Sequence, residues 1–215
     1  MENLQIKVII FDFDGVIVDS MDLKGWCFIN TFKDEYPLSK LTRLADYHFE
    51  HRGKTRYDKI RYLFNEILKK EIGDSEVKRY SERFSELVKE NMDKKYLINE
   101  VVEFVKNNYL GYDFYIASAS KEDELRELCK NFGIDEYFKG IYGLPRSKSV
   151  IVNGIIEDNG YKREDVVLIG DSQVDLEAAE KNKIRFYGYN NPDLKGSGTY
   201  LEKIVDLIGS KSADS

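Results

Sequence analysis

Four aspartates stand at or just beyond the ends of two strongly apolar segments. Asp12 and Asp14 follow the run KVIIF, while Asp171 follows VVLIG and precedes Asp175 by four residues. If the two segments are neighbouring parallel strands, their carboxyl ends meet at one edge of the sheet and the four carboxylates converge there. Such a cluster is repulsive unless a cation balances it, and Mg²⁺ prefers oxygen ligands. The spacing therefore predicts a magnesium site in which one aspartate attacks a substrate while its neighbour transfers protons.

Three further residues suit an anionic ligand. Ser118 ends the apolar segment FYIA, where its hydroxyl and nearby amides, including that of Ala119, can donate to phosphoryl oxygens. Lys148 lies near the start of a predicted helix, where the helix dipole disfavours a cation, so we expect it to neutralise the acidic cluster. Lys139 and Arg146 are alternatives for that role.

Short apolar segments alternate with amphipathic ones, as is typical of a parallel sheet joined by helices. Apolar spacing predicts helices that end at Gly133 and Gly209, and Ser120 with Asp123 resembles a capping box for the first. We predict an α/β core with a Rossmann-like (flavodoxin-like) parallel sheet. The strands expected in it are Lys7–Phe11, Asp113–Ala117, Val166–Ile169 and, from weaker patterns, Gly140–Tyr142 and Ile184–Tyr187.

The stretch from about residue 20 to residue 95 shows no strand pattern. Apolar periodicity predicts helices around Trp26–Phe32, Ile60–Ile72 and Val77–Val88. Because the stretch is too long for a plain crossover, we expect a second, all-helical domain inserted into the first. The predicted boundaries assign residues 1–17 and 96–210 to the α/β core, 18–95 to the helical domain and 211–215 to a disordered tail.

Composition narrows the function classes. The formal net charge of −6 argues against a general nucleic-acid or membrane surface, because both need a basic excess. Cys27 and Cys129 lack metal-site spacing, so we expect no disulfide framework or zinc site and a reduced, cytoplasmic setting. The polar start MENLQIK predicts no signal peptide, and no apolar run approaches the roughly 18 residues of a membrane span. We expect a small-molecule substrate, no nucleic-acid or membrane partner, and a monomer or weak dimer.

The segments DFDGVIVDS, YIASAS, PRSKS and IGDSQVD resemble, in this order, the four motifs of the haloacid dehalogenase superfamily. The resemblance covers residues 6–190, and the chain looks like the phosphatase-type members that carry a helical cap after the first motif. It implies that Asp12 is the nucleophile that forms an aspartyl-phosphate and that Asp14 is the general acid and base. It also implies that Ser118 and Lys148 hold the phosphoryl group. The implied Mg²⁺ ligands are Asp12, the backbone carbonyl of Asp14, Asp171 and, as a ligand or as a partner of the ligands, Asp175.

A basic turn, EHRGKTRYDKI, lies within the predicted helical domain. Arg52, Lys54 and Arg56 surround Gly53 there, either as a solvated turn or as a loop that supplies positive charge to an anionic substrate. The GKTR segment resembles the cap loop of β-phosphoglucomutases. This resemblance implies that Arg52, Gly53 and Arg56 bind the substrate, with Lys24 as a further candidate.

These features predict a Mg²⁺-dependent phosphatase that hydrolyses a small phosphomonoester, such as a sugar phosphate or a phosphoglycolate-like acid, with cap closure selecting the substrate. The nearest alternative is a β-phosphoglucomutase-like phosphomutase, which would return the phosphoryl group to the same sugar. A phospho-accepting receiver module is less favoured because no aspartate ends the segment FYIA. A catalytically inactive binding protein is less favoured because all the motif residues are present.

Overall fold

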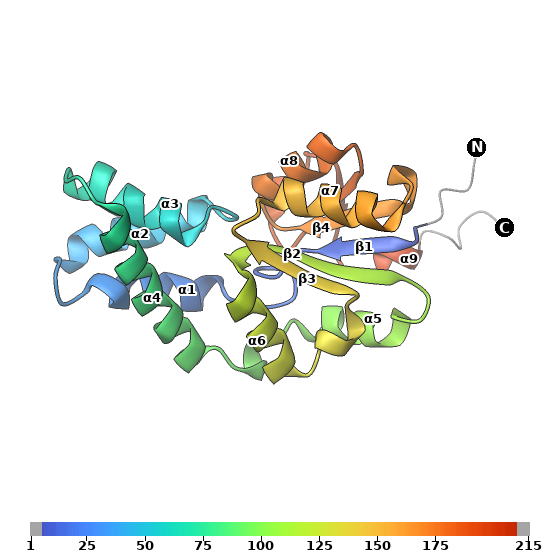
Figure 1. Cartoon of the computed structure of the whole chain (residues 1–215), viewed down its shortest axis with the longest axis horizontal. Coiled ribbons are helices and arrows are strands. Elements are labelled where there is room, and N and C mark those ends of the chain that lie inside the picture. Colours follow the sequence, from blue (N-terminus) through green and yellow to red (C-terminus); the bar gives the residue numbers. More distant parts are fainter. Residues whose placement is uncertain (1–5, 210–215) are drawn as a thin grey trace. The chain divides into compact units, whose positions relative to one another are not determined.

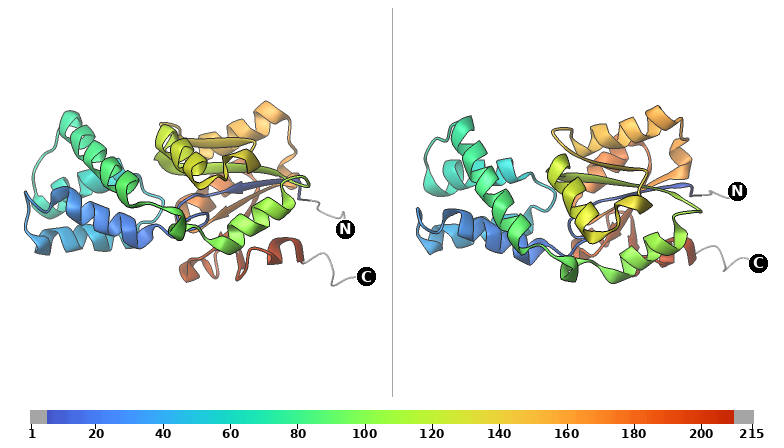
Figure 2. Two further views of the ribbon diagram at one scale, coloured as in Figure 1. Left: turned by 90° about the horizontal axis from the view of Figure 1, so that it is seen from below. Right: turned by 60° about the horizontal axis from the view of Figure 1, so that its bottom comes forward.

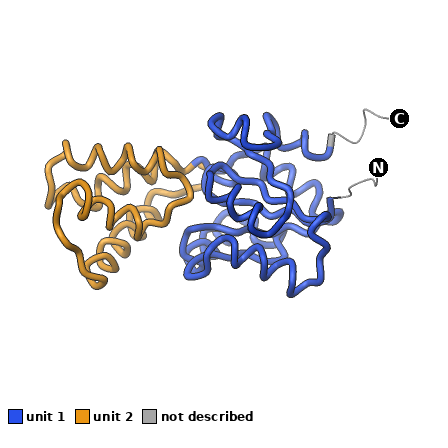
Figure 3. The backbone as a smooth tube through the Cα atoms, turned by 90° about the horizontal axis from the view of Figure 1, so that it is seen from above, with its two compact units in different colours: residues 1–19, 97–215 blue, residues 20–96 orange. Residues whose placement is uncertain are grey.

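The computed structural model describes residues 6–209, and its contacts divide the chain into two compact units (Figure 3). The α/β unit contains residues 1–19 and 97–215, and the helical unit contains residues 20–96. That the two units are separate domains with the boundaries given above stays a prediction. The predicted disordered tail, residues 211–215, lies outside the described residues.

A six-stranded, fully parallel sheet forms the centre of the α/β unit. Its strand order is β3-β2-β1-β4-β5-β6. Doubly wound sheets have two common strand orders, and this one is the Rossmann order. This confirms the predicted Rossmann-like parallel sheet, and it makes β1 and β4 neighbours, paired from Val8 with Val166 to Phe11 with Ile169. The strands are β1 (Val8–Phe11), β2 (Asp113–Lys121), β3 (Gly140–Leu144), β4 (Val166–Gly170), β5 (Arg185–Tyr189) and β6 (Thr199–Leu201).

Helices cover both faces of this sheet, which explains why its central strands are apolar throughout. On one face, Val8 and Ile10 of β1 pack with Ile151 and Ile155 of α7 and with Ala179 of α8. Figure 1 shows α7 and α8 together on that face, and Figure 2 shows α5 and α6 on the opposite one. The helices of this unit are α5 (Asn99–Asn108), α6 (Glu122–Phe132), α7 (Lys148–Asn159), α8 (Gln173–Asn182) and the short α9 (Asp206–Gly209).

Two local predictions in the α/β unit are wrong. The N-cap of α6 is Lys121 and makes no side-chain cap, because β2 continues through Ser120 and takes that residue out of the expected capping box. The helix expected from Leu201 to Gly209 is instead the end of β6, a turn and the short α9, because Leu201 pairs with Tyr189 of β5. Gly133 does end α6, in the left-handed conformation at φ 70°.

The described residues of the helical unit contain no strand, as predicted. Aromatic rings fill its core, with Phe32 against Tyr80 at 4.6 Å and Phe28 against Phe84 at 4.3 Å between ring centroids. The helices are α1 (Met21–Phe32), α2 (Leu38–Glu50), α3 (Arg56–Tyr62), a π-helical segment (Leu63–Leu68) and α4 (Asp74–Asn91). Within residues 6–209, no helix is long and apolar enough to cross a membrane.

Candidate active site

The turn after β1 is fixed to the neighbouring strand and to itself. The backbone N–H of Asp12 donates to the carbonyl of Ile169 on β4 at 2.9 Å, and Gly15 N–H donates to Val18 O at 2.7 Å. Gly15 has a φ of 81°, and a Cβ at this position would collide with the carboxylate of Asp171. Glycine is therefore needed here both for the left-handed backbone and for the close approach of the two loops.

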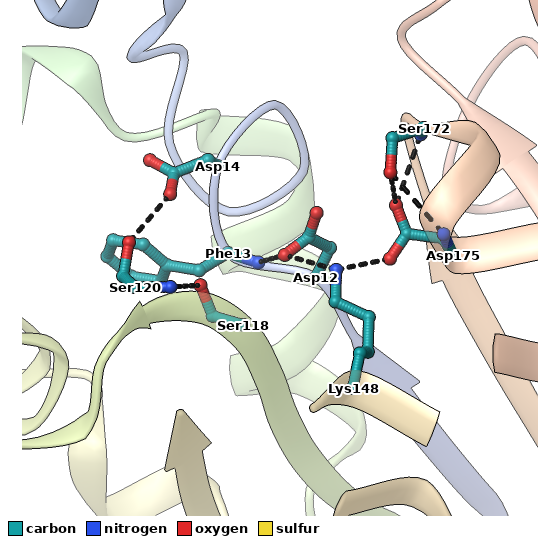
Figure 4. A network of polar contacts seen from close by, with 8 residues as sticks. All are labelled: Asp12, Phe13, Asp14, Ser118, Ser120, Lys148, Ser172 and Asp175. Carbon is teal, nitrogen blue, oxygen red and sulfur yellow. Dashed lines mark hydrogen bonds and ion pairs between the residues drawn. The ribbon is translucent and has the colours of Figure 1, made fainter. Parts of the chain in front are cut away.

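Asp12 lies buried at the centre of the site, where only 3% of its surface is exposed. Its Oδ1 accepts from the backbone N–H of Phe13 at 2.7 Å and faces the Lys148 ammonium at 3.0 Å (Figure 4). Burial, together with the negative charges of Asp175, Asp171 and Asp14, raises the pKa of the Asp12 carboxyl well above its usual range despite Lys148. Within the described chain, both polar contacts of this carboxylate fall on Oδ1.

Asp175 uses both of its oxygens to hold neighbouring groups. It forms a capping box with Ser172, whose backbone N–H donates to Asp175 Oδ2 at 3.1 Å and whose hydroxyl donates to the same oxygen. Its Oδ1 accepts from the ammonium of Lys148, so Lys148 bridges Asp12 and Asp175. Burial alone would lower the pKa of Lys148, but the two facing carboxylates outweigh burial and raise it. Lys148 is therefore charged at neutral pH.

Three buried carboxylates form a group that suits a divalent cation. Asp12, Asp171 and Asp175 each offer an oxygen within 4.8 Å of the others. This limit is close to the span of about 4.2 Å between opposite ligands of one Mg²⁺. One lysine cannot neutralise three carboxylates, and the donors are all hard oxygens, so the residues present fit Mg²⁺. The Asp14 carboxylate is not among the three, and its backbone carbonyl stays a predicted ligand.

The end of β2 lies beside Asp14. Ser118 is buried, and its Oγ accepts from the backbone N–H of Ser120 at 3.1 Å. The hydroxyl of Ser120 donates to Asp14 Oδ2 at 3.1 Å, so the Asp14 carboxylate is directed toward β2 (Figure 4). Ala119 lies between the two serines and is half-buried. The structure thus brings Asp12, Asp14, Ser118 and Lys148 to one edge of the sheet.

Comparison with known proteins identifies the family. A model of the family described as "Haloacid dehalogenase-like hydrolase" matches residues 9–189, which is most of the chain. The chain belongs to the haloacid dehalogenase-like hydrolase family. The match confirms the resemblance drawn from the four motifs, and it spans Asp12, Ser118, Lys148 and Asp171.

Individual relatives of this hydrolase are distant. A 5'-nucleotidase of Pseudomonas aeruginosa PAO1 is 27% identical over 92 residues, which cover 39% of this chain and 42% of that protein. A "predicted phosphoglycolate phosphatase" from Haemophilus somnus 129PT superposes with a TM-score of 0.79 at 20% identity, covering 97% of this chain and 99% of that one. A β-phosphoglucomutase from Clostridium difficile gives a TM-score of 0.73 at 18% identity, with 96% and 97% covered. At these identities the solved structures show a shared fold.

The alternative cations for the acidic cluster are engaged elsewhere. Lys139 forms an ion pair with Asp113 at 2.6 Å, and Arg146 pairs with Glu122 at 2.7 Å. Of the three cations considered, Lys148 is the one that faces Asp12.

The predicted substrate residues of the basic turn lie in the helical unit. Arg56 begins α3 and is buried, with its guanidinium donating to Ser85 and lying 5.1 Å from the centre of the Phe84 ring. These contacts join α3 to α4, so Arg56 stabilises its own unit. Gly53 adopts a left-handed φ of 75°, and Arg52 is half-buried. Whether Arg52, Gly53 and Arg56 bind substrate stays a prediction.

Sequence reasoning missed four residues that hold the site. Ser172 begins the pattern S-x-x-D, a detectable capping-box signature. The spacing of Ser120 from Asp123 favours a cap of α6, and only the pairing of β1 with β2 brings the Ser120 hydroxyl to Asp14. Asn190 and Asn191 follow β5 and donate to the loops of Gly15 and Asp171. Their position at the carboxyl end of a strand was the one available signal.

Proposed function

We propose that this protein is a Mg²⁺-dependent phosphatase that hydrolyses a small phosphomonoester through an aspartyl-phosphate on Asp12. The observation that carries the proposal is the Asp12 carboxylate itself. One of its oxygens is fixed by Phe13 N–H and Lys148, and the buried carboxylates of Asp171 and Asp175 lie next to it. A carboxylate held by one oxygen can attack with the other, which divides one difficult displacement into two easier steps.

In this proposal Mg²⁺ is held by Asp12, Asp171 and the backbone carbonyl of Asp14. Asp175 supports the site mainly through Lys148, because both of its oxygens already accept hydrogen bonds. When bound, Mg²⁺ supplies positive charge that keeps Asp12 ionised and offsets the negative charge of the phosphoryl oxygens. Lys148, the Ser118 hydroxyl and the amide of Ala119 orient the same oxygens.

Asp12 and Asp14 share the two chemical steps. An oxygen of Asp12 forms a bond to phosphorus while the bond from phosphorus to the leaving oxygen breaks, and Asp14 gives that oxygen a proton. Asp14, now ionised, takes a proton from a water molecule, whose oxygen bonds to phosphorus as the bond to Asp12 breaks. Inorganic phosphate leaves, and both aspartates return to their starting states. Proton transfer of this kind typically contributes about 10²–10⁴-fold to the rate.

The hydrogen bond from Ser120 supports the assignment of Asp14 to proton transfer. It holds the carboxylate on the β2 side of the site, next to Ser118, whose hydroxyl we assign to the phosphoryl group. An acid placed beside the phosphoryl site can reach the leaving oxygen, whereas Asp171 follows β4, on the far side of β1 and Asp12. This hydrogen bond from Ser120 can break when the Asp14 carboxylate turns toward the leaving oxygen.

Phosphate release from a panel of phosphorylated metabolites tests the proposal. The relatives suggest nucleoside 5'-monophosphates and phosphoglycolate, and the basic turn suggests hexose phosphates. We expect phosphate release with Mg²⁺, none with excess EDTA, and none from Asp12→Asn in Mg²⁺. Activity that survives in Asp12→Asn would overturn the covalent route.

Product analysis separates the hydrolase from the mutase. With a hexose 1-phosphate as substrate, the phosphatase yields free sugar and inorganic phosphate in equal amounts. The phosphomutase yields hexose 6-phosphate without net release of phosphate. Formation of the 6-phosphate as main product would replace the proposed phosphatase with the alternative.

A further inference from the structure

We infer that Asn190 and Asn191, in the loop after β5, are positioning residues that set the distance between the two loops bearing the metal ligands. Asn190 Nδ2 donates to the carbonyl of Gly15 at 3.0 Å, and Asn191 Nδ2 donates to the carbonyl of Asp171 at 2.7 Å. Adjacent amides of one loop thus hold the backbone of two other loops. The inference rests on the proposed Mg²⁺ site and adds residues to it that lie outside the four motifs.

The local backbone fixes both amides in place. Asn190 adopts a left-handed φ of 52°, which asparagine tolerates better than most residues. The Oδ1 of Asn191 accepts from the backbone N–H of Asp193 at 3.2 Å, which caps the short helix Pro192–Leu194. Because Asn191 Oδ1 is used as an acceptor, its Nδ2 must face Asp171 as a donor. The side chain therefore joins this helical turn to the Asp171 loop in one orientation.

The two carbonyls belong to loops that meet at the proposed metal. Gly15 follows Asp14 and lies against the carboxylate of Asp171, so the backbone of one loop contacts the ligand of the other. The backbone of β1 and β4 fixes this region through the bond from Asp12 N–H to Ile169 O, which lies before both loops. The asparagines hold the loops beyond that point. Mg²⁺ requires near-ideal octahedral geometry at 2.0–2.1 Å, so a change of a few tenths of an ångström in loop spacing weakens its binding.

Two variants remove the amide contacts with little other change. Asn190→Gly keeps the left-handed backbone, which glycine adopts freely, and loses only the side-chain contacts. Asn191→Ser keeps a hydroxyl that can accept from Asp193 N–H but is too short to reach Asp171 O. Asn108→Ala is the matched control, because Asn108 Nδ2 also donates to a backbone carbonyl, that of Phe104 at 2.7 Å, within α5.

The experiment measures the Mg²⁺ dissociation constant of the full-length, metal-free protein by isothermal titration calorimetry, with melting of the same samples in EDTA. We expect each asparagine variant to bind Mg²⁺ about tenfold more weakly, the size typical of lost contacts around metal ligands. Asn108→Ala should stay within about twofold of the parent. The Mg²⁺ concentration that gives half-maximal phosphatase activity should rise by a similar factor in each asparagine variant.

The outcomes separate this inference from the proposed function. If the parent binds Mg²⁺ and both asparagine variants bind it equally well, the positioning role is overturned and the metal site stands. The role is also overturned if the variants melt at lower temperature in EDTA but keep the parental Mg²⁺ affinity, since their effect is then on folding alone. If the parent itself binds no Mg²⁺, the proposed metal-dependent function fails and takes this inference with it.

Discussion

Replacing Asp12 with asparagine is expected to remove activity and, at the same time, to stabilise the metal-free protein. Asparagine keeps the shape of the side chain, and its oxygen can still accept from Phe13 N–H and from Lys148. What it removes is one negative charge from a buried site that contains two more, on Asp171 and Asp175. The repulsion among these carboxylates therefore destabilises the folded, metal-free protein until a cation binds.

The magnitude follows from the distances. With an effective dielectric constant of about 20, each repulsion of Asp12, taken at the 4.8 Å limit, costs about 3.5 kcal/mol, and the attraction to Lys148 at 3.0 Å contributes about 5.5 kcal/mol. Two repulsions exceed one attraction by roughly 1.5 kcal/mol, and burial of the charge adds to the excess. We therefore expect Asp12→Asn to raise the free energy of unfolding by about 2 kcal/mol, which corresponds to about 4–8 °C in Tm for a chain of this size.

The sign of the pH dependence is fixed by the raised pKa of Asp12. The folded state binds the Asp12 proton more tightly than the unfolded chain, so stability of the parent falls as pH rises from the unfolded pKa toward and through the raised value. The advantage of Asp12→Asn should therefore be largest at pH 8 and shrink toward pH 5. Calorimetric melting in EDTA over this range is the assay.

A lysine-paired aspartate outside the site provides the control. Asp165 faces Lys7 at 2.7 Å near the start of β4, so Asp165→Asn should leave stability unchanged or lower it by up to about 1 kcal/mol. The reasoning is refuted if Asp12→Asn lowers the melting temperature as Asp165→Asn does. A gain that is the same at pH 5 and pH 8 would equally contradict it.

Three further substitutions or labels test other parts of the structure. Lys148→Met leaves buried carboxylates unpaired, so it should lower kcat by at least about 10²-fold and the free energy of unfolding by about 3–5 kcal/mol. A free energy of unfolding equal to that of the parent, measured by urea denaturation, would contradict this. Arg56→Ala should destabilise the helical unit by about 1–2 kcal/mol, and the fluorescence of the sole tryptophan, Trp26, monitors this unfolding. The same substitution should raise KM for the true substrate but not for an aryl phosphate. Equal effects on the KM of both substrates would mean that Arg56 does not contribute to substrate selection. Burial raises the pKa of Cys27 to about 11 and that of Cys129 to about 12, so at pH 8 at most about one thiol in 10³ is ionised. The native protein should therefore resist alkylation that the unfolded protein undergoes. Rapid labelling of the native chain would show that the thiols are accessible.

The parts of the fold that depend on local pattern were predictable from sequence. The central strands β1, β2 and β4 are apolar runs because both faces of the sheet are covered. The edge strand β6 is three residues long, and its Leu201 stands at helical spacing from Ile204, so pattern alone favoured a helix. The helix α2 was not predicted, because Leu41 and Leu44 are the only large aliphatic residues on its buried face, where His48 takes an apolar position.

The site was predictable as far as it depends on strand ends. Asp12 and Asp171 could be brought together from sequence because each directly follows a strongly apolar strand, and Lys148 because its place at a helix start was unfavourable without a partner. Contacts made between segments that show no pattern of their own could not be predicted. Ser120 reaches Asp14 only because β2 lies beside β1, and Asn191 reaches Asp171 only because β5 lies beside β4.

Direct detection of the phosphorylated enzyme tests the central claim most sharply. The protein is mixed with Mg²⁺ and the substrate found in the panel, quenched in acid within the first turnover, digested at low pH and analysed by mass spectrometry. The account predicts a peptide from the segment DFDGVIVDS that carries one phosphoryl group on Asp12, and that is absent from Asp12→Asn. A phosphoryl group on a different residue, or full turnover in which no phosphorylated peptide forms, would contradict it.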